Sequence, residues 1–218
     1  MALKLILLFL PWPWRRRLLT WLFGYELHPT SRIGKSWVYP KQLVLRQHAS
    51  IGHLNFMKGL DRLELGEHSS LGHLNWITGH PSDGVHFKHV VDRCPSLVLG
   101  DHASITSHHF LDCASRIRIG KFTTVAGVHS QFFTHNLDVE NGRQDSRPIE
   151  IGAYCLVATG VVIVAGSVLP DCSVLAAMSL LNKRYSETHR LYAGVPAVPV
   201  KQISAEALYF KRTRGFVE

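Results

Sequence analysis

The chain has 218 residues, of which 46% are hydrophobic and 18% are charged, so it can bury the core of one domain and is not intrinsically disordered. Its net charge of +8 lies mostly at the two ends, with +4 in residues 1–24, +2 in residues 201–218 and only +2 between them. A nucleic-acid-binding domain needs its cations on a folded face, so we expect no nucleic-acid partner.

Residues 3–23 form an apolar and basic segment, LKLILLFLPWPWRRRLLTWLF. Pro11, Pro13 and the arginines at 15–17 interrupt it before it reaches the ~20 apolar residues of a spanning helix, and no signal-peptide cleavage site follows. Tryptophans beside arginines suit the interface of a bilayer. We expect residues 1–30 to be a helical appendage. Either its residues 1–24 contact the cytoplasmic face of a membrane, or it packs on its own domain or a neighbouring subunit.

A six-residue repeat dominates the rest of the chain. The segment 48–55, HASIGHLN, recurs at 68–75 as HSSLGHLN, and aliphatic residues recur every six positions, with the longest run at Ile151, Val157, Ile163, Leu169 and Leu175. The residue after each aliphatic position is often Gly or Ala, and the fourth after it is small or β-branched. This period excludes an amphipathic helix and simple strand alternation. It predicts a parallel β-helix with three flat strands per coil, the aliphatic position inside and the small residue at the corner.

These steps, [LIV]-[GA]-x-x-[STAVC]-x, resemble the hexapeptide-repeat acyltransferases, whose fold is a left-handed parallel β-helix. The match is strongest over residues 99–200, weaker over 33–77 and absent over 1–30. The resemblance implies an all-β solenoid over residues 31–182 and a closing segment over 183–218 with a short helix at 204–213. It also implies a homotrimer with sites between neighbouring subunits.

Two stretches break the period, residues 78–96 and 136–148. Their Gly, Pro, Asp and Asn content is typical of loops that leave the coils. Loops on a rigid solenoid usually carry specificity, so we expect the acceptor contacts there.

The segment FTHNLD at 133–138, followed by RPIEIG at 147–152, resembles the part of the maltose and galactoside acetyltransferases that carries the catalytic histidine. An imidazole there takes the proton of a sugar hydroxyl as the oxygen attacks a thioester carbonyl. The resemblance assigns His135 as general base and Asp138 as the residue that orients it or holds the substrate. The Asn that this branch places one coil earlier is missing. The expected substrate-binding residues are His108, His109, His129 and Arg147.

The segment YAGVPA at 192–197 resembles the Gly-x-Pro-Ala element that lies beside acyl-CoA in these enzymes. A pantetheine arm needs a groove lined by small residues, and its phosphates need cations. The expected groove residues are Ala158, Ala176, Ala177, Gly194 and Pro196. The expected phosphate ligands are Lys183, Arg184 and Lys201. The alternatives are ordinary surface cations and a chain-terminating turn.

Paired histidines support a rival interpretation. His48 and His53, and His68 and His73, are each five positions apart, as in the zinc sites of γ-class carbonic anhydrases, but a third ligand has no matching position. We expect a histidine ladder on the solenoid instead, and no metal. A third hypothesis is a non-catalytic trimeric scaffold.

The four cysteines form no closely spaced pair, so we expect a reducing, cytoplasmic environment. The sequence therefore predicts a cytoplasmic, acetyl-CoA-dependent O-acetyltransferase, whose acceptor is a sugar or polysaccharide-precursor hydroxyl.

Overall fold

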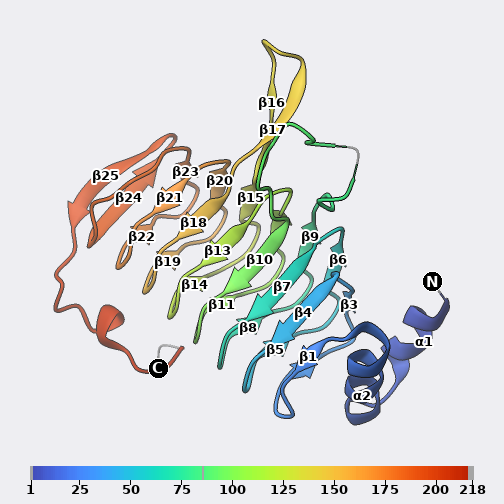
Figure 1. Ribbon diagram of the computed structural model, residues 1–218. Coiled ribbons are helices and arrows are strands. Elements are labelled where there is room, and N and C mark those ends of the chain that lie inside the picture. Colours follow the sequence, from blue (N-terminus) through green and yellow to red (C-terminus); the bar gives the residue numbers. More distant parts are fainter. Residues whose placement is uncertain (1, 85, 216–218) are drawn as a thin grey trace.

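The computed structural model describes residues 2–84 and 86–215, and most of these residues wind into successive coils of parallel strands (Figure 1). Each coil adds one strand to each of three sheets, which we call A, B and C, and the corners between them are the A–B, B–C and C–A corners. This arrangement confirms the predicted left-handed parallel β-helix. Sheet A contains β1 (Glu26–Leu27), β4 (Gln42–Leu45), β7 (Arg62–Leu65), β10 (Ser96–Leu99), β13 (Ile117–Ile119), β18 (Ile149–Ile151) and β21 (Val168–Leu169).

Sheet B contains β2 (Arg32–Ile33), β5 (Ser50–Ile51), β8 (Ser70–Leu71), β11 (Ser104–Ile105), β14 (Thr124–Val125), β19 (Leu156–Val157), β22 (Val174–Leu175), β24 (Arg190–Gly194) and β25 (Ala197–Gln202). Sheet C contains β3 (Trp37–Val38), β6 (Phe56–Lys58), β9 (Trp76–Thr78), β12 (Phe110–Asp112), β15 (Gln131–Phe133), β20 (Val162–Val164) and β23 (Leu180–Leu181). The first strand starts at Glu26, before the expected boundary at residue 31.

The six-residue step fills the interior of the solenoid. In sheet B the aliphatic positions of successive coils pair in register and are buried; they are Ile51, Leu71, Ile105, Val125, Val157 and Leu175. The small residues at the corners, among them Ala103, Thr123, Cys155 and Ser173, are also buried. Each coil therefore buries its apolar side chains against the next coil, which is where a solenoid gains its stability.

Glycine at the B–C corner is required by the distance between coils. A Cβ atom on Gly52 would lie 2.4 Å from the carbonyl oxygen of Gly72, and one on Gly34 would lie 2.6 Å from that of Gly52. Because these contacts are far below van der Waals separation, a side chain at either position would force the backbones apart.

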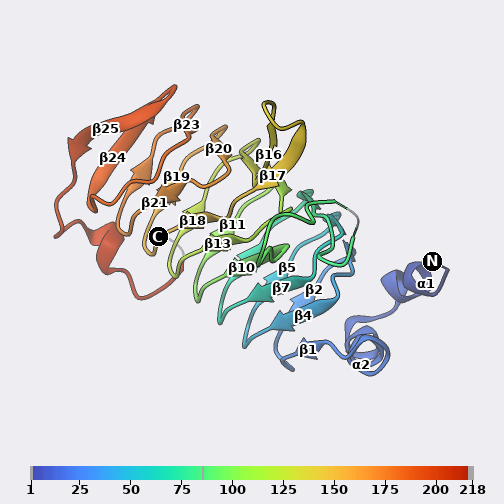
Figure 2. The same cartoon turned by 45° about the horizontal axis from the view of Figure 1, so that its top comes forward.

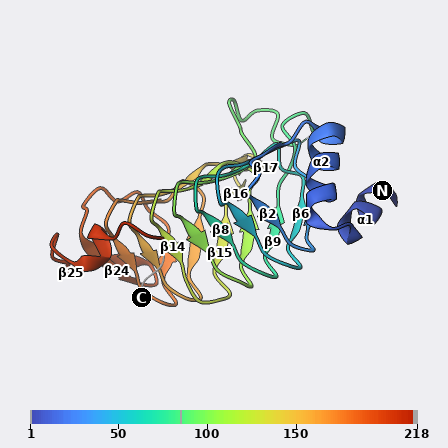
Figure 3. The same ribbon diagram turned by 90° about the horizontal axis from the view of Figure 1, so that it is seen from below.

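Two helices, α1 (Ala2–Phe9) and α2 (Trp12–Phe23), precede the first coil, and α2 lies across the open end of the solenoid (Figure 3). The buried guanidinium group of Arg15 donates hydrogen bonds to the carbonyl oxygens of Gly34 (2.8 Å) and Ser36 (3.1 Å). Trp12 donates from Nε1 to the Ser31 carbonyl at 2.8 Å. Arg15 and Trp12 thus attach α2, which caps the open end, to its own domain. No helix within the described residues has both the length and the apolar character that crossing a membrane requires.

Both irregular segments leave the solenoid at the C–A corner (Figure 2). Residues 79–95 connect β9 to β10, and those of them that the structure describes form no strand. The second segment, expected as a loop over 136–148, is instead an antiparallel hairpin of β16 (His135–Asp138) and β17 (Arg143–Ser146). The turn between them, residues 139–142, contains the Asn141–Gly142 pair, a composition typical of tight hairpin turns.

At the other end, the antiparallel pair β24–β25 closes sheet B. The only helix that the structure describes in the closing segment is the short 3-10 helix Leu208–Lys211, within the expected range 204–213. The chain then runs back along the coils, where Arg212 donates to the carbonyl oxygen of Phe122 and Tyr209 donates to that of Cys155 at 3.1 Å. These contacts fasten the closing segment to the solenoid.

Candidate active site

His135 is held by a carboxylate from the preceding coil. Its Nδ1 forms a hydrogen bond with Oδ2 of Asp112, whose side chain is only 6% exposed, whereas that of His135 is 40% exposed. The carboxylate accepts, so Nδ1 carries the hydrogen and Nε2 keeps its lone pair. An imidazole in this tautomer can take a proton at Nε2.

The backbone around this pair is fixed from both coils. Asp112 Oδ1 accepts a hydrogen bond from the Ala114 amide at 2.9 Å, so both carboxylate oxygens are engaged. Thr134 Oγ1 donates to the Asp112 carbonyl at 2.8 Å and accepts from the Ser115 amide at 2.8 Å. These bonds lock the rotamer of Asp112 and the start of β16, and thereby preorganise the imidazole.

The excursion over residues 79–95 contributes one wall of the site. The His80 and Phe87 rings lie 6.4 Å and 6.3 Å from the His135 ring, centroid to centroid, and Phe87 is buried. Arg93 ties this segment to the coils, since its guanidinium group donates to the carbonyl oxygens of His80 (2.5 Å) and Ala114 (2.7 Å) and lies over the Phe87 ring. Partial burial lowers the pKa of His80, and the nearby Asp112 carboxylate opposes this shift.

The hairpin places Ser146 next to His135. Ser146 is paired directly with His135 across β16 and β17, so the two side chains lie on the same face of the hairpin. The Ser146 hydroxyl is buried and has no hydrogen-bond partner among the described residues. Buried polar groups normally have a partner, so this hydroxyl is an exception beside His135.

Asp138 does not orient the imidazole, so that part of the sequence-based expectation is wrong. Its carboxylate accepts hydrogen bonds from Asn141 within the hairpin turn, at 3.1 Å from the backbone and 2.8 Å from the side chain, and it lies near Arg143. These hydrogen bonds lower the pKa of Asp138. Asp112 occupies the orienting position instead.

The three histidines expected around the substrate lie elsewhere. His108 and His129 are exposed at the B–C corner, with their rings 6.2 Å apart, at the far end of sheet C from His135. His109 is buried, accepts a hydrogen bond at Nδ1 from the Ser130 amide (3.1 Å) and contacts Thr106 Oγ1 through Nε2 (2.9 Å). Burial lowers the pKa of His109 to about 4. It is a neutral packing residue, and none of the three contacts His135.

Arg147 lies at the base of the hairpin. Its amide donates to the Thr134 carbonyl at 2.9 Å, and its exposed side chain pairs with Asp145 at 3.3 Å. It is therefore next to the start of β16 and remains a candidate acceptor ligand.

The residues expected to bind CoA fall into two groups. Ala158, Ala176 and Ala177 follow sheet B strands at the B–C corner. Gly194, the last residue of β24 before the turn that holds Pro196, donates a hydrogen bond from its amide to Ser179 Oγ at this corner, at 3.1 Å. Lys183 and Arg184 follow β23 at the C–A corner, the corner of His135, and Lys201 lies on the outermost strand β25. A single chain therefore does not bring the expected groove, the cations and the imidazole together.

The paired histidines form ladders. The rings of His48, His68, His102, Phe122 and Tyr154 stack along the A–B corner at centroid distances of 4.6 to 4.9 Å. His73 Nδ1 accepts the His53 amide at 3.0 Å, and His53 Nδ1 accepts the Lys35 amide at 3.2 Å. Within the part of the chain that the structure describes, no three His, Cys, Asp or Glu side chains are placed to hold a metal ion.

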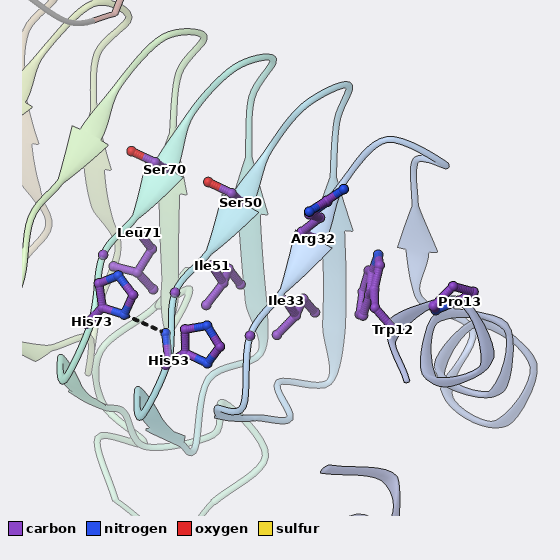
Figure 4. A pocket seen from close by; sticks show the side chains of 13 residues that line it. Trp12, Pro13, Arg32, Ile33, Ser50, Ile51, His53, Ser70, Leu71 and His73 are labelled. Carbon is purple, nitrogen blue, oxygen red and sulfur yellow. Dashed lines mark hydrogen bonds between the residues drawn. The ribbon is translucent and has the colours of Figure 1, made fainter. Parts of the chain in front are cut away.

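A shallow groove of about 730 Å³ lies beside α2, across β2, β5 and β8 (Figure 4). Trp12 and Pro13 form one side, and His53 and His73 lie on the other. Its lining contains no carboxylate, and the Nδ1 atoms of both histidines are engaged with backbone amides. It lacks the acid–base pair found at His135, so we place the candidate active site at the C–A corner.

No family model and no curated protein matches the chain by sequence. Solved structures do match its fold. A hexapeptide-repeat acetyltransferase from Vibrio cholerae, solved with acetyl-CoA, has a TM-score of 0.50 and 20% identity, over 93% of this chain and 84% of its own. The polysialic acid O-acetyltransferase OatWY has a TM-score of 0.56 and 19% identity, over 87% and 90%. The N-acyltransferase AntD from Bacillus cereus, solved with dTDP-4-amino-4,6-dideoxyglucose and CoA, has a TM-score of 0.54 and 11% identity, over 78% and 84%.

These similarities confirm the expected resemblance to hexapeptide-repeat acetyltransferases at the level of the fold. Sequence reasoning missed Asp112, His80, Phe87 and Ser146. The coil register contained a signal for Asp112, since it pairs with Phe133, two residues before His135. The other three come from segments without a repeat.

Proposed function

We propose that this protein is an acyl-CoA-dependent O-acetyltransferase that acts on a hydroxyl group of a sugar or polysaccharide precursor. The observation that carries the proposal is the hydrogen bond between His135 Nδ1 and the almost fully buried Asp112 carboxylate, placed between two excursions from the solenoid. The fold shared with acetyltransferases supplies the reaction class, and the pair supplies a base.

In the proposed reaction His135 Nε2 takes the proton of the acceptor hydroxyl while the oxygen attacks the thioester carbonyl of acetyl-CoA. The tetrahedral intermediate collapses, the C–S bond breaks, and the imidazolium returns its proton to the departing CoA thiolate. Asp112 keeps the imidazole in the required tautomer and stabilises its charged form. His80, Phe87 and Arg147 surround the base from the two excursions and are the proposed acceptor contacts.

The proposed enzyme is a trimer. Within one chain the small residues expected to line the CoA groove lie at the B–C corner, and His135 lies at the C–A corner, at the opposite end of sheet C. A neighbouring chain that presents its B–C corner to this C–A corner would bring a CoA groove to the imidazole. Ala158, Ala176, Ala177 and Gly194 would then serve the partner's base.

The test is a thiol-release assay with acetyl-CoA and three acceptor classes: a neutral oligosaccharide, a polysialic acid and a 4-amino-sugar nucleotide. We expect turnover with a hydroxyl acceptor and a loss of about 10²- to 10⁴-fold in His135→Ala. If only the amino sugar were turned over, the enzyme would be assigned as an N-acetyltransferase instead of an O-acetyltransferase. If His135→Ala retained full activity, or if acetyl-CoA did not bind the wild-type protein in a calorimetric titration, the proposal would fail.

A further inference from the structure

The two N-terminal helices present apolar side chains on two opposite sides. On α2 the side chains of Trp12, Arg15, Leu19 and Phe23 face the solenoid, at the spacing of one helix face. A second stripe, at positions i, i+3, i+4, i+7 and i+8, faces away from it. The exposed residues of that stripe are Trp14, Arg17, Trp21 and Leu22, whereas Leu18 at its edge is partly buried against the core.

The outward stripe is largely uncovered. Trp14 is 65% exposed and Trp21 is 78% exposed, and Leu22 is also exposed. The same holds on one face of α1, where Ile6 is 61% and Phe9 is 73% exposed, while Leu7 on the other face is buried in the cap. Such large apolar side chains gathered at one end of a protein mark an interaction surface. We call the six outward residues Leu3, Ile6, Phe9, Trp14, Trp21 and Leu22 the terminal patch.

Neither helix contains an acidic residue, and Arg17 is exposed within the stripe. Lys4 and Arg16 are half-buried and reach toward the domain: Lys4 lies over the Phe23 and Tyr39 rings, and Arg16 donates to the Leu27 carbonyl at 3.5 Å. Arg32 is exposed next to Trp12 on the adjoining coil (Figure 4), and no acidic residue precedes Glu26 in the chain. An apolar stripe with tryptophans and flanking cations matches the interface of an anionic bilayer, where indole rings lie at headgroup depth and cations meet phosphates.

We propose that the terminal patch of α1 and α2 binds peripherally to the surface of an anionic lipid bilayer. The inward face of α2 attaches the helix to the first coil through Trp12 and Arg15. The outward face can therefore enter the headgroup region while the solenoid stays folded. The proposal rests on exposure and charge, and it does not depend on the proposed acetyltransferase activity.

The experiment is co-sedimentation of the full chain with vesicles of phosphatidylcholine, with and without 30% phosphatidylglycerol as the anionic probe. We expect the wild-type protein to pellet with the anionic vesicles and about tenfold less with phosphatidylcholine alone. Raising the salt concentration should release it. The variant Ile6→Ser/Trp14→Ser/Trp21→Ser should lose at least about tenfold in partitioning, and Arg17→Gln should lose less.

A matched variant, Leu137→Ser/Val139→Ser, removes exposed apolar side chains from the distant hairpin and should pellet like wild type. All variants should keep the wild-type melting temperature, since they alter exposed positions. Wild-type protein that stays in the supernatant with both vesicles overturns the proposal. So does a triple variant that pellets fully. A triple variant that changes only the oligomeric state, measured by light scattering, would assign the patch to a second copy of the chain.

Discussion

The substitution Asp112→Asn tests the proposed mechanism most directly. The carboxylate accepts two hydrogen bonds, one from His135 Nδ1 and one from the Ala114 amide at 2.9 Å. An amide of the same shape has only one acceptor oxygen. If that oxygen keeps Ala114, the new NH₂ group faces Nδ1 and forces the hydrogen to Nε2, which is the wrong tautomer for a base.

The expected loss follows from these two contacts. A hydrogen bond to a charged group contributes about 1.5–3 kcal/mol, which corresponds to roughly 10- to 150-fold in rate. The wrong tautomer can raise the loss toward about 10⁴-fold. Because Asp112 is buried beneath the imidazole and away from the expected CoA groove, we expect the loss in kcat and an unchanged KM for acetyl-CoA.

The assay is steady-state thiol release at saturating acceptor, with a thermal melt of each variant. Asp138→Asn is the matched control, because Asp138 is on the same hairpin but hydrogen-bonds within its turn, and it should retain kcat within about twofold. A folded Asp112→Asn enzyme with wild-type kcat would refute the assignment of Asp112. A large loss in Asp138→Asn would restore the role that the sequence motif assigned to it.

Three further predictions concern the scaffold and the site wall. Gly52→Ala should lower the melting temperature by about 2–12 °C, since its Cβ would lie 2.4 Å from the Gly72 carbonyl oxygen and overpacking costs about 1–3 kcal/mol. Phe87→Ala should reduce kcat/KM for the acceptor by roughly 10- to 100-fold in the thiol-release assay, because it removes a wall beside His135. His109→Asn should make the melting temperature less sensitive to acid between pH 7.5 and 5. Burial lowers the pKa of His109 to about 4 in the folded protein, so the unfolded state binds a proton at a higher pH than the folded state does. The free energy of unfolding of the wild-type protein therefore falls by about 2 kcal/mol between pH 7.5 and 5.

Each of these has a nearby control. Gly142→Asn changes a glycine with no neighbour within 4 Å and should cost much less stability. Val91→Ala alters an exposed side chain in the same excursion as Phe87 and should leave acceptor kinetics unchanged. His108→Asn alters an exposed neighbour of His109 and should melt with wild-type acid sensitivity. A control that behaves like its paired variant would contradict the structural cause given for that variant.

The fold was predictable because one rule repeats. An aliphatic residue every six positions has a single packing solution, and Leu71, Ile105 and Val125 stack inside as the period predicts. His135 could be found from its motif. The same motif points to Asp138 as its partner, because Asp138 is near it in sequence; Asp112 is near His135 only through the register of neighbouring coils, in which it pairs with Phe133.

The N-terminal segment was ambiguous for a different reason. Both of its faces are apolar and basic, so composition does not tell which face packs and which stays free. In the structure Trp12 and Arg15 pack on the domain, whereas Trp14 and Trp21 stay exposed, so contact with a membrane or with a neighbouring subunit would use the second pair. Only the direction of each side chain separates them.

The position of the excursions gives the solenoid a particular tolerance. Leu65 pairs with Leu99 across the first excursion and Ile117 pairs with Ile149 across the hairpin, so neither insertion disturbs the strand register. Segments at the C–A corner can therefore change length while Asp112 and the start of β16 keep their register. Under the proposed function, acceptor choice would change with them. The number of residues in a coil cannot change in this way. Deletion of a single residue between Asp112 and Phe133 would shift one coil against the next and separate Asp112 from His135, although neither residue is changed.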